Sequence, residues 1–435
     1  MNGLLRGRLV EVSPQSLLID VEARLWRIPV RCDVSTLQAA DFVELRTTPD
    51  AASLSSVVEA RLLARPVGTG QPFPSPGGDY FRLNRDRRRP LLGQRGRVLA
   101  AIRSYFAAHD FLEIEAPLLV PSPGLELHLQ GFSVADASGQ GSPRYLITSP
   151  EYQLKRLLVG GLTRIYSLGK VFRTGEAGPH HNPEFTMLEW YRAYQDWQSV
   201  AADVAALSAQ LATELHGSPR FVRHDAGGHV QQIDLSLPWP QRSVREVVWE
   251  YAQLEVRGDE SVAELAQKIS QAGYRLPQPT CTDEDGSPLW AWDDLFFSVF
   301  LDQVEAKLAL PDHDGILRPC VLYDWPSPLC ALARRKPGSP EVVERFEAYV
   351  AGLELCNGFG ELCDPKEQRQ RFLHDLTERQ RRGLPEYPID ERFLLALAEG
   401  MPPSGGVALG VDRLLMLLLD AQHIREVLPF GTDEL

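Results

Sequence analysis

The sequence predicts an α+β protein in which a small β-barrel precedes an antiparallel sheet flanked by helices. Two observations support this fold class. Strand-like and helix-like segments follow one another without the regular alternation that a parallel sheet requires. In addition, the first 64 residues contain about five short segments in which apolar and polar residues alternate. The chain has 435 residues, which is enough for about two to four domains.

The predicted barrel comprises residues 1–64. Its strands are expected at residues 4–10, 16–21, 25–30, 42–45 and 57–63. Five short strands joined by polar turns are typical of an OB-like barrel. Seven arginines and eight acidic residues make the segment almost neutral, whereas an RNA-binding barrel usually has a basic and aromatic face. For residues 1–64, a role in packing or in docking a partner is therefore at least as well supported as RNA binding.

Residues 65–79 are rich in proline and glycine and are predicted to be a linker. Residues 80–435 are then expected to form one large domain. Seven arginines crowd its beginning, between positions 82 and 97. Such a run usually lies on a solvated helix face, and a docking patch for an acidic partner is the alternative interpretation.

The large domain should contain both helices and strands. Apolar residues at helical spacing predict a helix that reaches about residue 109. Further helices are expected at residues 150–160, 196–215, 259–273 and 366–382. Strands are expected at residues 111–120, 144–149, 163–173, 184–192, 318–324, 347–357 and 405–411.

Composition excludes several classes of protein. The net charge of −13 disfavours nonspecific coating of nucleic acid, because neutralising phosphates needs clustered basic residues. The six cysteines are scattered without a Cys-x-x-Cys pair, as expected for reduced thiols in the cytoplasm. No secretion signal and no run long enough for a membrane span is apparent. We therefore expect a cytoplasmic protein that does not bind a membrane.

Two segments carry most of the chemical information. In residues 172–191, Arg173 leaves a strand, an excursion with glycine and proline follows, and a second strand returns. An arginine at the base of such a hairpin can bind a phosphate or a carboxylate with two hydrogen bonds. In residues 404–414, a strand of small residues allows a ligand to approach closely and then delivers Arg413 at the start of an apolar helix.

These segments resemble motifs 2 and 3 of the class II aminoacyl-tRNA synthetases, and Pro117 resembles the proline of motif 1. The similarity is greatest to the lysyl branch, which shares residues 145–152 and residues 354–362 with this chain. It extends from about residue 80 to the C-terminus. The resemblance implies an antiparallel synthetase sheet flanked by helices, and a ligase that uses ATP and Mg²⁺.

Within that branch the chain resembles the elongation factor P lysine ligases more than the lysyl-tRNA synthetases. Ala408 and Cys356 stand where the synthetases generally have glycine, and Ser149 stands where they tend to have alanine. Residues 126–129 resemble an acidic-x-His-Leu segment of the ligases. The implied reaction activates lysine, as β-lysine, and transfers it to a lysine side chain of elongation factor P.

Two other functions remain open. The first is a lysyl-tRNA synthetase that charges tRNA with α-lysine. The second is a catalytically inactive paralogue that serves as a regulatory or binding subunit, which would predict loss of the arginines and glutamates described next. The stereochemistry of the lysine, the acceptor and the role of residues 1–64 stay open at this stage.

The resemblance implies roles at the nucleotide end of the site. Arg173 would bridge the substrate carboxylate and the α-phosphate, and Arg413 and His181 would hold the γ-phosphate. Phe185 and Arg413 would sandwich adenine. Both arginines are the expected catalytic residues. The motif 2 loop normally has a glutamate one position earlier than Glu176, so the contact of Glu176 with ATP is an open question.

The resemblance also implies a metal site and an amino-acid site. Glu347 and Glu354 would coordinate Mg²⁺, and Glu354 would also contact ATP. Their spacing of seven places them on one face of a helix or on opposite faces of a strand. The implied substrate-binding residues are Ser149, Glu151, Glu189, Tyr191, Asn357, Phe359, Glu361 and Ala408. Pairing of motif 1 strands implies a homodimer.

Overall fold

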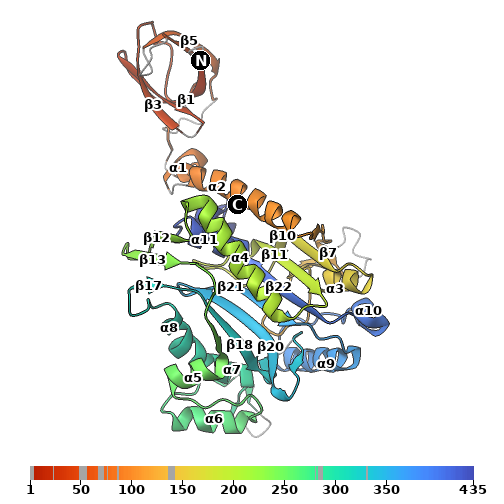
Figure 1. The fold of residues 1–435 in the computed structure, drawn as a ribbon. Helices are drawn as coiled ribbons and strands as arrows, with labels where there is room; N and C mark the ends of the chain where they lie inside the picture. The colour runs from red at the N-terminus through yellow and green to blue at the C-terminus, as the bar shows by residue number, and fades with distance from the viewer. Residues whose placement is uncertain are drawn as a thin grey trace. The chain divides into compact units, whose positions relative to one another are not determined.

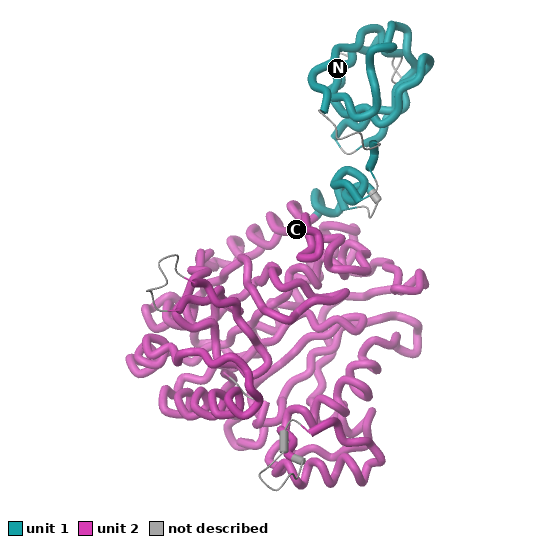
Figure 2. The backbone as a smooth tube through the Cα atoms, turned by 180° about the vertical axis from the view of Figure 1, so that it is seen from behind, with its two compact units in different colours: residues 1–94 teal, residues 95–435 magenta. Residues whose placement is uncertain are grey.

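The computed structural model describes residues 4–22, 24–48, 56–66, 73–75, 77–85, 88–135, 143–279, 281–282, 288–329 and 332–435. The chain forms two compact units, residues 1–94 and residues 95–435 (Figure 2). Among the described helices, none combines the length and the apolar character that crossing a bilayer demands.

The first unit is built on a five-stranded antiparallel sheet. Its strands are β1 (Leu4–Val12), β2 (Ser16–Val21), β3 (Arg24–Pro29), β4 (Phe42–Thr47) and β5 (Val57–Ala64), in the order β3-β2-β1-β4-β5. An isolated parallel bridge between Val30 and Val57 joins the two ends of this order. The apolar positions of the alternating segments, such as Leu9 and Ile19, form the core of the unit. All five expected strands are confirmed, and the topology is that of an OB-like fold.

Two helices follow, α1 (Asp79–Arg85) and α2 (Arg88–Ala108). Much of the expected linker, residues 65–79, lies outside the described residues. The interpretation of the arginine run as a solvated face is wrong for Arg88 and Arg95, which are both buried. Arg95 donates hydrogen bonds to Asp412 and, over 2.8 Å, to Thr186 Oγ1. A buried arginine needs such partners, because burying an unpaired charge is costly.

The second unit is organised around one large sheet (Figure 1). Its order is β14-β18-β20-β21-β22-β11-β10-β6, and β19 pairs with β20. The strand pairs are antiparallel except at the two edges, β14–β18 and β10–β6. The strands are β6 (Leu112–Glu113), β10 (Arg164–Phe172), β11 (Glu184–Ala193), β14 (Gln241–Ser243), β18 (Cys320–Pro326), β19 (Arg335–Lys336), β20 (Ser339–Val350), β21 (Leu353–Gly360) and β22 (Ser404–Gly410). The predicted α+β class, with an antiparallel sheet flanked by helices, is confirmed.

Helices cover this sheet on more than one side. The described α-helices are α3 (Glu151–Val159), α4 (Trp197–His216), α5 (Val244–Ala252), α6 (Val262–Gln271), α7 (Trp292–Val299), α8 (Ala306–Leu308), α9 (Pro365–Arg381), α10 (Glu391–Gly400) and α11 (Val411–Leu418). Helix α4 crosses the sheet (Figure 1), and its Trp197 stacks on Tyr323 and Phe346. Helices α3, α9 and α10 share one apolar cluster.

Shorter elements complete the unit. Three small sheets contain β7 (Leu119–Val120), β8 (Ser133–Val134) and β9 (Arg144–Leu146); β12 (Arg220–His224), β13 (Val230–Asp234) and β17 (Ile316–Leu317); and β15 (Cys281–Thr282) with β16 (Pro288–Leu289). A π-helix spans Phe300–Glu305, and 3₁₀ turns span Ser327–Leu329, Ile424–Val427 and Thr432–Glu434. The strand expected over residues 111–120 is reduced to β6 and β7, since Pro117 between them cannot donate to a ladder.

One expected element is wrong in a way that matters for the site. Residues 347–357 do not form a single strand, because the chain reverses at Ala351 and Gly352, which have φ of 51° and 77°. Successive positive φ values are typical of a tight hairpin turn. Glu347 therefore lies on β20 and Glu354 on β21, in neighbouring antiparallel strands. Neither arrangement expected from their spacing applies.

Candidate functional site

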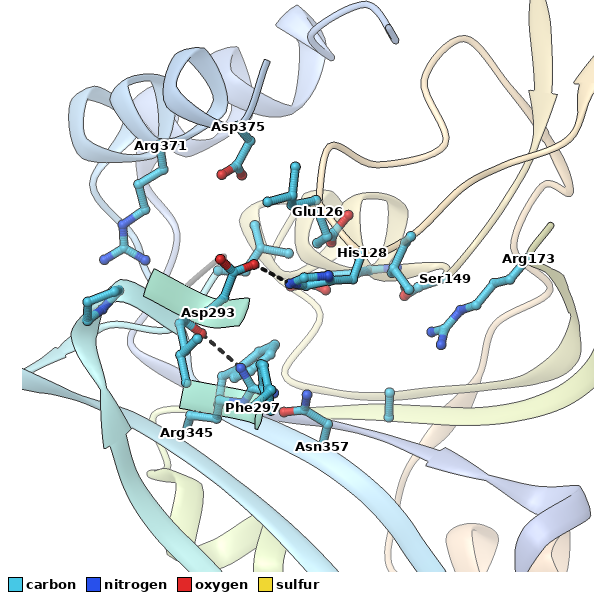
Figure 3. A pocket seen from close by; sticks show the side chains of 18 of the residues that line it. Glu126, His128, Ser149, Arg173, Asp293, Phe297, Arg345, Asn357, Arg371 and Asp375 are labelled. Atoms are coloured by element: carbon cyan, nitrogen blue, oxygen red, sulfur yellow. Dashed lines mark hydrogen bonds and ion pairs between the residues drawn. The ribbon is translucent and has the colours of Figure 1, made fainter. Parts of the chain in front are cut away.

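A cavity of about 1340 Å³ opens in the second unit. Its wall comes from the sheet strands β11, β21 and β22, from the loop at residues 126–129 and from helices α7 and α9 (Figure 3). Cavities that bind small molecules usually measure about 300–1,000 Å³. This cavity exceeds that range, so it can hold more than one small molecule.

Arg173 stands where strand β10 enters the loop before β11. Its Nε donates a hydrogen bond to the Thr148 carbonyl oxygen over 3.2 Å, and its guanidinium carbon lies 5.2 Å from the centre of the Phe185 ring. Glu176 is its ion-pair partner at 3.7 Å. The long pairing of β10 with β11 fixes the base of this hairpin, so the arginine is held at a defined point of the cavity wall.

Arg413 lies in the first turn of α11. Its Nη1 donates to the Glu354 carbonyl oxygen at 2.9 Å and to Glu354 Oε2 at 3.2 Å, while Nη2 donates to His181 Nε2. Burial, reinforced by the charge of Arg413, lowers the pKa of His181. A neutral imidazole can accept this hydrogen bond, so the three side chains form one polar group at the cavity wall.

A second polar group lies deeper, behind the wall. Glu189 is buried on β11 and accepts hydrogen bonds from the hydroxyls of Ser149 at 2.6 Å and Tyr191 at 2.8 Å. Burial, together with the negative charge of Glu151, raises the pKa of Glu189 to about 8. A carboxylate with only hydroxyl donors around it is poorly stabilised, and a cation in reach would be bound strongly.

Lys155 joins two more carboxylates in the same region. It is fully buried on α3, and its ammonium contacts Glu151 and, at 2.5 Å, Glu361 Oε2. Burial alone would lower the pKa of Lys155, but the charges and hydrogen bonds of Glu151 and Glu361 raise it. The pKa of Glu361 rises to about 8, chiefly because the group is buried.

Two acceptors of this region are left without a donor. Within the described chain, Asn357 Oδ1 and Glu361 Oε1 are buried and have no hydrogen-bond partner. Gly406 makes the close packing possible, since a Cβ there would lie 2.2 Å from Glu361 Oε1 and 2.3 Å from the Tyr191 ring. Orphaned buried acceptors are uncommon in proteins and suit a ligand that brings N–H donors.

Most of the residues that the sequence singled out line the cavity. Those that do are Ser149, Glu151, Arg173, Glu176, His181, Phe185, Glu354, Asn357, Phe359, Ala408 and Arg413. The others lie behind it: Glu189, Tyr191, Glu347 and Glu361. The cavity wall and the buried layer are joined by direct contacts, such as that between Ser149 and Glu189.

A comparison with models of protein families identifies the family of this chain. Residues 78–434 match the model described as tRNA synthetases class II (D, K and N). The chain belongs to this family. The matched residues include every member of the two polar groups, together with the whole wall of the cavity.

Curated relatives of this class II synthetase chain are ligases. An elongation factor P--(R)-β-lysine ligase of Haemophilus ducreyi is 38% identical over 343 residues, which are 78% of this chain and 93% of that protein. The ligase of the same name from Salmonella gallinarum is 36% identical over 79% of this chain and 95% of that protein. A lysine--tRNA ligase of Dehalococcoides mccartyi is 36% identical over 80% of this chain but only 65% of that protein. The class II synthetase chain is accordingly a ligase.

Some residues of this class II site were not predicted from the sequence. Glu126 lines the cavity next to Glu151, and its buried Oε2 has no partner within the described chain. Burial, with the charge of Glu151, raises the pKa of Glu126 to about 7. The acidic-x-His-Leu pattern drew attention to this loop without placing it in the site. Asp293 was missed because an isolated charged residue gives no sequence signal of its own, and Lys155, which lies in a segment similar to the lysyl branch, was not assigned a role.

Proposed function

We propose that the protein activates lysine, in the form of β-lysine, as an adenylate and transfers it to a lysine side chain of elongation factor P. The observation that supports lysine as the substrate is that the site contains more buried carboxylates than buried cations. Glu151 and Glu361 share one ion-pair partner, Lys155, and Glu189 accepts hydrogen bonds only from the hydroxyls of Ser149 and Tyr191 among the described residues. A substrate with two ammonium groups would balance the remaining charge, and its carboxylate would meet Arg173.

The nucleotide end of the cavity suits ATP, the substrate that class II ligases use. Arg173 would bridge the amino acid carboxylate and the α-phosphate while charge develops there, which is the largest contribution that a protein makes to such a step. Arg413 and His181 would hold the γ-phosphate, and Phe185 with Arg413 would enclose adenine. Glu176, which lies 3.7 Å from Arg173, would be near the adenine base.

Mg²⁺ would be held by Glu347 and Glu354. Both oxygens of Glu347 already accept hydrogen bonds, from Arg345 and Tyr349, and each oxygen keeps a further lone pair. Glu354 is half-buried at the cavity wall. In the described residues, no three carboxylate, histidine or cysteine side chains gather around one point, which fits an ion bound largely by phosphates and water. Such an ion would neutralise phosphate charge.

The preference for β-lysine is assigned to the methyl group of Ala408. This residue lies on β22, directly between Glu189 of β11 and Asn357 of β21. Ala408→Gly should shift the preference toward α-lysine by about tenfold or more, since one buried methyl group is worth roughly 1–3 kcal/mol of discrimination. The relative rates of pyrophosphate exchange with the two isomers measure it. Ala351→Gly, in the β20–β21 turn, is the matched control, and an unchanged ratio in Ala408→Gly would count against the assignment.

Binding of the amino acid should release protons. The pKa of Glu189 and that of Glu361 are both about 8 in the free protein, and an ammonium ion beside them favours the ionised form. The complex then binds fewer protons than the free protein, so affinity should rise as the pH increases from 6 to 8. Calorimetry with β-lysine at pH 7, in buffers of different ionisation enthalpy, measures the release. Glu189→Gln should reduce it, and a binding heat independent of buffer would contradict the charge argument.

The acceptor and the assembly belong to the same proposal. The relatives named above support elongation factor P, and the nearly neutral residues 1–64 support it over an anticodon reader. A lysyl-tRNA synthetase is the second candidate, since one such ligase is also similar to this chain. We expect a cytoplasmic homodimer with residues 80–435 as its catalytic domain. An inactive paralogue is disfavoured because Arg173, Arg413, Glu347 and Glu354 are all present.

The acceptor is tested by incubating the full chain with ATP, each lysine isomer, and either elongation factor P or tRNA. We expect β-lysine to be attached to a lysine side chain of the factor, detected in the intact mass and located by peptide fragmentation. Efficient charging of tRNA without modification of the factor would assign the chain to the synthetases. Sedimentation of the same preparation tests the dimer.

A further inference from the structure

A histidine and an aspartate from distant parts of the chain meet at the cavity. His128 Nε2 lies 2.7 Å from Asp293 Oδ2, and the His128 side chain, which is 57% exposed, is one of those that line the cavity. Asp293 belongs to α7, whereas His128 belongs to the loop at residues 126–129. Figure 3 shows His128 between Asp293 on one side and Ser149 and Arg173 on the other. None of the roles assigned above uses this pair.

Asp293 is held in the ionised state. Arg382 Nη2 donates to both of its oxygens, at 3.0 and 3.2 Å. Burial would raise the pKa of Asp293, but the hydrogen bond from His128, with the charge and hydrogen bonds of Arg382, lowers it. An ionised carboxylate only accepts hydrogen bonds, so His128 donates its Nε2–H. In a neutral ring the lone pair then lies on Nδ1, which has no partner within the described residues.

The loop that carries His128 is fixed on both sides. Arg379 is buried, and its Nη1 donates to the carbonyl oxygens of Glu126 and Leu129 at 3.0 and 3.1 Å. One residue further on, the Gln130 carbonyl oxygen accepts from the Thr174 backbone N–H at 2.8 Å, next to Arg173. Backbone bonds of this kind connect the loop directly to the arginine at the reacting centre. A catalytic side chain must be positioned by such a supporting layer.

We propose that His128 is the general base of the transfer step and that Asp293 sets its tautomer. This rests on the proposed function, in which an amine attacks an adenylate. The neutral acceptor amine attacks the carbonyl carbon and forms a C–N bond, and the C–O bond to phosphate breaks, so that AMP leaves with that electron pair. The nitrogen then has one proton too many. That proton passes to Nδ1 of His128, which releases it to water.

Other charged groups face the pair, and other histidines line the cavity. Asp375 of α9 lies near His128. Burial raises the pKa of Asp375 to about 6, and the charge of a protonated His128 would lower it. His180 and His181 lie beside Arg413, at the nucleotide end. His374 has no hydrogen bond to a carboxylate in the described chain. Of these rings, His128 alone combines a fixed tautomer with a nitrogen free to accept a proton, as far as the described residues show.

The test separates the two half-reactions. Adenylate is formed on the full-length enzyme with ATP and β-lysine, and its consumption is followed after mixing with elongation factor P or with N-acetyl-lysine amide. His128→Ala should leave pyrophosphate exchange within about twofold of wild type and slow transfer by about 10²-fold or more. Added imidazole should restore transfer in proportion to its neutral fraction. His374→Ala, another cavity histidine, should transfer at the wild-type rate.

The outcomes distinguish this inference from the proposed function. Transfer at the wild-type rate in His128→Ala overturns the inference, and so does a slow His128→Ala that imidazole does not rescue while His128→Asn is fully active. The wild-type enzyme could fail to modify elongation factor P and still transfer β-lysine to the small amine with the same dependence on His128. That result would contradict elongation factor P as the acceptor and support His128 as the general base. Asp293→Asn should slow transfer and keep exchange, because an amide can hold the ring in the other tautomer.

Discussion

Arg173→Ala should lower the rate of adenylate formation by about 10²- to 10³-fold, the usual cost of removing a donor aimed at developing negative charge. Arg173 stands at the cavity end of a hairpin that is paired over its whole length, and Phe185 lies against its guanidinium. The loss should appear in the maximal rate of lysine-dependent pyrophosphate exchange. It should not be recovered at saturating lysine, since the interaction strengthens in the transition state.

Two further variants sharpen this prediction. Arg173→Lys keeps the charge but loses the planar fork, so it should remain strongly impaired. Arg164→Ala removes an exposed arginine at the opposite end of β10, whose side chain donates a hydrogen bond to the His109 carbonyl oxygen. That control should retain the wild-type exchange rate. Near-normal exchange in Arg173→Lys would show that charge alone suffices and that two-point recognition is not required.

Lys155→Met should destabilise the fold by about 3–5 kcal/mol at pH 8, because it leaves buried carboxylates without a cation. Lys155 is fully buried and is the shared partner of Glu151 and Glu361. Chemical denaturation of wild type and variant measures the change in the free energy of unfolding. Lys170→Met, which removes a partly exposed lysine paired with Glu184 at 3.4 Å, should cost about 1 kcal/mol or less.

The pH dependence of this loss has a definite sign. Burial already raises the pKa of Glu361 to about 8, and without Lys155 it rises further above its value in the unfolded chain. A carboxyl whose folded pKa is raised takes up a proton on folding, so the variant loses stability as the pH increases. The defect should therefore shrink toward pH 6. Lys155→Met combined with Glu361→Gln should recover part of the stability, and a loss that is the same at both pH values would contradict the ion-pair explanation.

The parts of the site that the sequence could predict are those built from contiguous segments. The hairpin around Arg173 and the strand that delivers Arg413 form as expected, because each lies within one short stretch whose alternation and glycines determine its local structure. The β20–β21 turn was missed because its local sequence lacks a turn signal. Ala351 and Gly352 interrupt an apolar run without the Asn-Gly or Asp-Gly signal of a tight turn, so the run read as a single strand.

The parts that could not be predicted depend on long-range contacts. His128 and Asp293 are far apart in sequence, as are Lys155 and Glu361, and neither pair leaves a periodic pattern. Arg95 illustrates the same limit, since it is buried against Asp412, a residue far away in the sequence. Charge runs predict solvent exposure only when no partner lies across the fold.

The buried carboxylates are expected to select an amino acid with a second ammonium group. The most direct measurement compares pyrophosphate exchange with β-lysine, α-lysine and norleucine, an analogue of α-lysine that ends in a methyl group. A site built around buried polar groups rejects an analogue that lacks their partner by about 10⁴-fold. We expect β-lysine to react best, α-lysine to react more slowly, and norleucine to give no exchange above background. Exchange with norleucine at a rate near that of α-lysine would contradict the claim.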